Sequence, residues 1–289
     1  MAVSNNIFIK MRELRNSMTP TERTILEYIL EYRDEIPLLS IKDLAKRSRT
    51  SDASVLRFCK ALGYRGYRDF IVAVSAALAA SSEKAQSEYT DIRPGDGLST
   101  IIDNISFTNC KSIQDTMSVI DRDAIKRSVE LLKDTSLIDF YGVGASGVVC
   151  MDAQQKFSRI GKICFAYTDG HSQLTSASLL HPGDVAVLIS NSGDTSEILD
   201  TLHVVKQNGA STIAITRYAK SDLANQADIV LSISTPEITI RSGAMGSRIA
   251  MLNIIDILFA GVASADYENV KKYLTKTHNV LIAKHKHFI

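Results

Sequence analysis

Residues 185–197 read VAVLISNSGDTSE, and the change of character within this stretch decides the fold. Val185–Ile189 is a short apolar run rich in β-branched residues, which is typical of a buried parallel strand. Ser190–Thr195 brings hydroxyl side chains and one glycine into a loop, and residues 197–206 have apolar positions spaced for one helix face. Such a loop before a helix N-terminus favours phosphate binding. An ordinary Asn-Ser-Gly turn capped by Thr195 is the alternative.

A second loop of the same kind follows a predicted strand at residues 137–141. Residues 142–147 read GVGASG and precede a predicted helix that ends at about residue 160. As a bare pattern this is the G-x-G-x-x-G fingerprint of dinucleotide binding, with Asp169 placed about 20 residues downstream to hold a ribose. A nicotinamide enzyme, however, would have no use for the serines of the later loop. Two serine-bearing loops fit one small phosphorylated ligand better.

Predicted strands alternate with predicted helices from residue 136 onward. The strands are expected at residues 137–141, 163–167, 185–189, 212–216 and 229–233, and they are followed by long helices at 244–265 and 266–284. This alternation requires a parallel sheet covered by helices on both faces, with ligands at the carboxyl ends of the strands.

The first 80 residues are more basic than the rest of the chain. They contain 13 Lys and Arg against 9 Asp and Glu, and the remaining 209 residues carry net −3. Within residues 40–68 the balance is 8 basic against 2 acidic. A basic module in front of a mildly acidic body favours contact with a polyanion.

Two short helices joined by a tight turn are predicted inside this basic module. Ser40 begins the first helix, and the second begins at Ser51 or Asp52 and exposes Ser54, Arg57 and Lys60 opposite its apolar face. This arrangement is typical of a helix-turn-helix. A three-helix bundle whose basic residues only solvate its surface is the alternative.

The turn between these helices departs from the usual motif at Arg49. This position normally holds a glycine able to adopt positive φ. Either Arg49 accepts that conformation at a modest energetic cost, or the turn differs in detail.

Several classes of protein are disfavoured by the rest of the sequence. The four cysteines form no C-x-x-C pair and no metal-binding spacing, so they are expected to be reduced thiols in a cytosolic protein. The helix at 244–265 is interrupted by Arg248, Asn253 and Asp256, so we expect a core or subunit-interface helix and no membrane span. His285 and His287 are expected in a solvated tail.

The paired loops resemble those of the sugar isomerase (SIS) domain. They read G-x-G-x-S at 142–146 and S-x-S-G-x-T at 190–195, and the resemblance covers roughly residues 125–268. With the helix-turn-helix and the run RSGAMGSRIAMLNIIDILF at 241–259, nearly the whole chain is similar to the RpiR-type (MurR/RpiR) bacterial transcription regulators. That resemblance implies an all-α helix-turn-helix DNA-binding domain followed by a five-stranded parallel-sheet α/β sandwich of Rossmann-like type.

The resemblance also implies domain bounds, partners and sites. The expected domains are a DNA-binding domain at 1–80, a linker with connecting helices at 81–124, a sugar-phosphate-binding domain at 125–268 and a C-terminal helix and tail at 269–289. The DNA-binding residues are expected to be Ser51, Ser54, Arg57, Lys60, Arg65 and Arg68. The effector-binding residues are expected to be Gly144, Ser146, Ser190, Asn191, Ser192, Gly193, Thr195, Glu237 and Arg241. The implied protein is a cytoplasmic homodimer or homotetramer that controls carbohydrate uptake or breakdown genes without a cofactor, metal or membrane.

A sugar-phosphate (aldose–ketose) isomerase is the alternative function. It would need a general base such as Glu197 or Glu237 and a second acid or base such as His171. Nothing in the sequence pairs these groups, and an isomerase leaves the basic module without a role. We therefore expect a regulator and not an enzyme.

Overall fold

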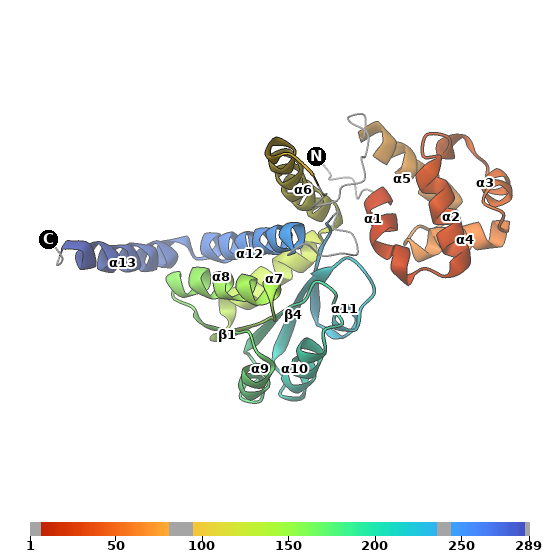
Figure 1. Ribbon diagram of the computed structural model, residues 1–289. Helices are drawn as coiled ribbons and strands as arrows, with labels where there is room; N and C mark the ends of the chain where they lie inside the picture. Colours follow the sequence, from red (N-terminus) through yellow and green to blue (C-terminus); the bar gives the residue numbers. More distant parts are fainter. Residues whose placement is uncertain (1–6, 81–94, 236–243, 287–289) are drawn as a thin grey trace. The chain divides into compact units, whose positions relative to one another are not determined.

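The computed structural model describes residues 7–80, 95–235 and 244–286, which divide into two compact units (Figure 1). The first unit contains the described residues before 81 together with the short segments 117–119 and 218–220, and the second contains the rest.

The first unit is helical. Its helices are α1 Ile7–Leu14, α2 Pro20–Glu31, α3 Ile41–Arg47, α4 Asp52–Ala61 and α5 Tyr67–Ala80, with short 3-10 helices at Arg15–Ser17 and Ile36–Leu38. Helices α2, α3 and α4 begin where Thr19, Ser40 and Ser51 accept hydrogen bonds from backbone N–H groups three residues on. Their apolar faces meet in one core, in which Phe58 and Phe70 pack edge to face with ring centroids 5.9 Å apart.

The second unit is built on a five-stranded parallel sheet, as predicted. The strands are β1 Leu137–Tyr141, β2 Ile163–Tyr167, β3 Val185–Ile189, β4 Ser211–Arg217 and β5 Ile229–Ile233, in the order β2-β1-β3-β4-β5. The helices are α6 Leu98–Val119, α7 Arg122–Asp134, α8 Ala145–Arg159, α9 Gly170–Ala177, α10 Ser196–Gln207, α11 Asp222–Gln226, α12 Met245–Ala265 and α13 Tyr267–Lys286.

Helices cover both faces of this sheet, with α7, α8 and α12 on one side and α9 and α10 on the other (Figure 1). Because side chains alternate along a strand, β3 serves two cores. Val187 and Ile189 pack with α8 and α12, whereas Ala186 and Leu188 pack with α10. Burial on both faces explains why this strand reads as an unbroken apolar run.

Helix α12 is the one helix within the described ranges that is long and apolar enough to cross a membrane by length and composition alone. A core helix of a soluble protein passes the same test. Ala250, Ile254 and Leu258 of α12 pack in the core that covers the sheet, and 33% of its apolar stretch is buried in this unit. The expectation of a core or subunit-interface helix keeps both alternatives.

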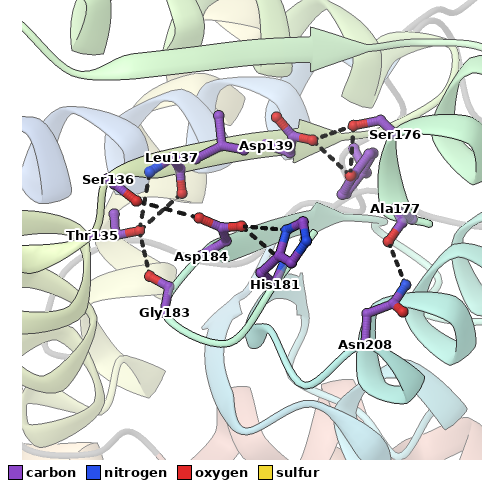
Figure 2. A network of polar contacts seen from close by, with 11 residues as sticks. Thr135, Ser136, Leu137, Asp139, Ser176, Ala177, His181, Gly183, Asp184 and Asn208 are labelled. Atoms are coloured by element: carbon purple, nitrogen blue, oxygen red, sulfur yellow. Dashed lines mark hydrogen bonds and ion pairs between the residues drawn. The ribbon is translucent and has the colours of Figure 1, made fainter. Parts of the chain in front are cut away.

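Polar contacts of Thr135 and Ser136 join the segment before β1 to the segment before β3, and those of Asp139 join β1 to α9 (Figure 2). The Oγ1 atom of Thr135 lies 2.9 Å from the carbonyl oxygens of both Leu137 and Gly183. The Asp139 carboxylate accepts hydrogen bonds from Ser176 and, at 2.9 Å, from the Tyr141 hydroxyl. Asp139 is 1% exposed, and this burial raises the pKa of its carboxyl.

Candidate functional site

The sheet order makes β1 and β3 direct neighbours, and a pocket lies beside the loops that follow them. Tyr141 at the end of β1 is in register with Leu188 of β3. The strand that follows β1 in the chain, β2, lies on one side of it, whereas β4, which follows β3, lies on the opposite side. A reversal of strand order of this kind opens a crevice at the carboxyl ends of the two central strands, here β1 and β3.

The pocket has a volume of about 230 Å³, which is below the range of about 300–1,000 Å³ typical of drug-sized ligands. By this volume the pocket suits a small ligand. Its lining residues are Val143, Gly144, Ala145, Ser146, Ile189, Ser190, Asn191, Ser192, Thr195, Ala244, Ser247, Arg248 and Met251.

Three hydroxyl groups of the β3–α10 loop form a compact cluster at this pocket. Ser190 Oγ lies 2.9 Å from Thr195 Oγ1 and 3.4 Å from Ser192 Oγ, and the latter two oxygens are 3.3 Å apart. The N–H of Gly193 donates to Ser190 Oγ at 3.2 Å and that of Asp194 donates to Ser192 Oγ at 3.3 Å. The loop thus presents adjacent rotatable donors of the kind that phosphate oxygens accept.

Three helices begin at the pocket without a side-chain cap. The N-cap residues are Gly144 for α8, Thr195 for α10 and Ala244 for α12, and none of them makes a side-chain cap hydrogen bond. All three line the pocket. Helices α7, α9 and α11 of the same unit are instead capped by Asp121, Asp169 and Ser221. The positive dipole ends of the three helices at the pocket favour an anion.

Backbone conformation at two loop positions requires glycine. Gly144 has φ 58° and ψ −126°, a region that side chains with a β-carbon rarely adopt. Gly193 has φ 73°, and a β-carbon there would lie 2.1 Å from Ser221 Oγ. Each glycine therefore lets its loop turn sharply from strand into helix.

Arg248 and Ser247 also line the pocket, although neither was predicted from the sequence to bind the effector. Arg248 was noted only as an interruption of an apolar helix. Its position in the first turn of that helix could have indicated a binding role, because a charged side chain is unusual at the start of an otherwise apolar helix. Within the described part of the chain, no carboxylate pairs with Arg248.

The structure brings most of the predicted effector residues together. Gly144, Ser146, Ser190, Asn191, Ser192 and Thr195 line the pocket, whereas Gly193 supports the loop from behind it. Asn191 is 9% exposed, and its Oδ1 atom has no hydrogen-bond partner among the described residues. Glu237 and Arg241 lie outside the described residues, so their assignment stays a prediction.

Three residues of the two alternative functions, Asp169, His171 and Glu197, do not line the pocket, and a fourth, Glu237, lies outside the described residues. Asp169 caps α9 by accepting the Ser172 N–H at 3.0 Å, which lowers the pKa of its carboxyl. His171 and Glu197 are exposed. Hydrogen bonds from its own backbone N–H and from Ser196 lower the pKa of Glu197, which makes it a weaker base.

The turn between α3 and α4 shows which backbone conformation Arg49 adopts. Arg49 adopts φ 54°, so it accepts the left-handed conformation that the motif normally gives to glycine. The N–H of Thr50 donates to the Ala45 carbonyl at 2.8 Å and that of Arg49 donates to Lys46 at 3.2 Å. These two bonds make a Schellman motif at the end of α3.

The predicted DNA-binding residues are not equally accessible. Arg57, Lys60, Arg65 and Arg68 are exposed, and Arg65 pairs with Asp69 at 2.7 Å. The expectation that Ser54 is exposed is wrong, because this residue is 8% exposed. The Ser54 hydroxyl lies 2.9 Å from Ser51 Oγ and accepts a hydrogen bond from Arg57 at 3.2 Å. Ser54 therefore orients the arginine next to it.

Comparisons with known proteins match both units. The helix-turn-helix domain of the rpiR family matches residues 5–81, and the SIS domain matches residues 131–261. The chain is 42% identical to an uncharacterized HTH-type transcriptional regulator of Caldanaerobacter subterraneus, over 96% of this chain and 97% of that protein. It is 31% identical to the HTH-type transcriptional regulator RpiR of Escherichia coli K12, over 92% and 89%.

A solved structure resembles the chain over nearly its full length. It is the Vibrio vulnificus NanR protein complexed with ManNAc-6P, with a TM-score of 0.60 and 28% identity, covering 96% of this chain and 98% of that one.

Proposed function

This chain belongs to the RpiR family of helix-turn-helix transcriptional regulators, and we propose that a sugar phosphate bound in the SIS-domain pocket controls its affinity for operator DNA. The observation that carries the proposal is the convergence of three uncapped helix N-termini, a hydroxyl cluster and Arg248 on one small pocket. Each of these features favours an anion with several acceptor oxygens.

The proposed binding mode divides the ligand between two parts of the pocket. Ser146, Ser190, Ser192 and Thr195 donate hydroxyls to the phosphate, and Arg248 supplies positive charge. The unpartnered Oδ1 of Asn191 accepts a hydrogen bond from a sugar hydroxyl. The similarity to the NanR structure, which holds a phosphorylated amino sugar, supports a phosphosugar as the ligand class.

We propose sensing without turnover. The pocket lining of the described residues contains hydroxyl, amide, guanidinium and apolar groups but no carboxylate or imidazole to move a proton between carbons. The curated relatives are named as transcriptional regulators. An isomerase, moreover, would leave the DNA-binding unit without a purpose.

On the DNA side, Ser51 and Arg57 approach base edges in the major groove, and Lys60, Arg65 and Arg68 meet phosphates. The proposed form is a cytoplasmic homodimer or homotetramer whose paired heads read half-sites set by their separation. Effector binding need shift DNA affinity by only about 1–3 kcal/mol, and DNA must change effector affinity by the same factor.

The test follows DNA affinity, thermal stability and ketose–aldose conversion of the purified protein across a panel of phosphosugars. One phosphosugar should raise the melting temperature and change DNA affinity, whereas its unphosphorylated sugar should do neither. The Ser192→Ala variant should lose about 10- to 100-fold in effector affinity, and Ser172→Ala, an exposed serine outside the pocket, should behave as wild type. Turnover without DNA binding would refute the proposal.

A further inference from the structure

The outward face of helix α4 carries a leucine among its polar residues. At about 100° per residue, Ala53, Leu56, Arg57 and Lys60 fall within a single arc of the helix. Val55, Phe58 and Cys59 point the opposite way and are 0% exposed. Ala53, Arg57 and Lys60 are exposed, and Leu56 is 37% exposed.

Leu56 does not belong to the fully buried core of its own domain. Its side chain is partly covered, and 37% of the residue stays exposed on the outward arc. It lies in the second turn of α4, next to the arginine that Ser54 orients. In a helix-turn-helix, the N-terminal turns of the second helix are the part that meets base edges.

The chemistry of the major groove restricts what such a leucine can contact. Most features presented there by the base pairs are hydrogen-bond donors and acceptors, which a leucine can only desolvate. The C5-methyl group of thymine is the apolar feature that each T·A pair offers. An aliphatic side chain that enters the groove beside an arginine therefore gains contact where a thymine is present and loses hydration where it is not.

We propose that Leu56, with Ala53 one turn before it, contacts the C5-methyl group of a thymine and so selects a T·A pair beside the base pair read by Arg57. This inference rests on the proposed DNA-binding function and adds a residue and a base to it.

The test uses uracil, which differs from thymine only by the missing methyl group. A duplex is first selected from a random library by the full-length protein, and each thymine in turn is then replaced by uracil. Wild type should bind about 3- to 10-fold more weakly when the contacted thymine is replaced, which corresponds to burial of one methyl group. Replacement of the other thymines should leave affinity unchanged.

The Leu56→Ala variant should bind the thymine and uracil duplexes with nearly equal affinity. Leu38→Ala is the matched control, because Leu38 is 85% exposed in the same unit but lies outside α4, and this variant should keep the wild-type methyl dependence. Both variants should melt as wild type. The inference is overturned if wild type ignores every thymine-to-uracil change, or if Leu56→Ala loses as much affinity as wild type. If no duplex is enriched at all, DNA reading itself is refuted.

Discussion

Replacing Arg248 by methionine tests whether the pocket recognises charge. Methionine keeps much of the length of the side chain and removes its positive charge and donors. Arg248 lies in the first turn of α12 at the pocket and is partly buried, so its field at the ligand is less screened than that of a surface cation. The α12 backbone should be unaffected, because methionine is a good helix former.

The size of the effect follows from what remains after the substitution. A hydrogen bond between charged partners contributes about 1.5–3 kcal/mol, so its loss predicts effector binding that is about 10- to 150-fold weaker. Three helix N-termini, each contributing about 0.3–1 kcal/mol, and the hydroxyl cluster still face the ligand. Binding should therefore be weakened and not abolished.

Titration calorimetry with the phosphosugar found in the panel measures this loss. The second pKa of a phosphate ester is about 6, so wild-type affinity should rise between pH 5 and 7 as the dianion forms. Arg248→Met should show a shallower rise. Arg159→Met removes an exposed cation of the same unit that does not line the pocket, and it should behave as wild type. An unchanged dissociation constant for Arg248→Met would refute the role of this charge.

Three further substitutions test the fold around the two sites. Arg49→Gly should stabilise the protein by about 0.5–1 kcal/mol in urea unfolding, because it relieves a left-handed residue at φ 54° and Arg49→Ala does not. Gly193→Ala should destabilise by at least about 1–3 kcal/mol and abolish the effector-induced thermal shift, since its β-carbon would meet Ser221. The melting temperature of the Asp139→Asn variant should increase relative to that of wild type as the pH rises from 4 to 7. Burial raises the pKa of the Asp139 carboxyl above its ordinary value of 3.8. In wild type the neutral carboxyl therefore stabilises the folded state below that pH, and this stabilisation is lost as the pH rises and the buried carboxyl ionises. An equal difference at every pH would contradict this account.

Local patterns were sufficient for the elements, and six of the nine residues expected to bind the effector line the candidate pocket. The strands at 137–141, 163–167, 185–189 and 229–233 lie where the apolar runs predicted them, because each run is bounded by turn residues. The inner strands β1 and β3 are buried on both faces, whereas one face of each edge strand, β2 and β5, is less buried. The predicted helix start at Ser40 is also observed, because its side chain accepts a hydrogen bond from the Asp43 N–H within the same turn. The exposure of Ser54 was predicted wrongly because its hydroxyl turns back to Ser51, which helical periodicity does not reveal.

The sequence by itself determined that this chain pairs a basic helical head with a parallel sheet whose loops carry hydroxyls, since composition, periodicity and caps act over a few residues. Only the tertiary structure decided that the strands beginning at 137 and 185 are neighbours, and that a helix more than 50 residues later begins at the same pocket and adds Arg248. Strand order and the place where a helix begins depend on packing between segments far apart in the chain, and no local pattern encodes such contacts.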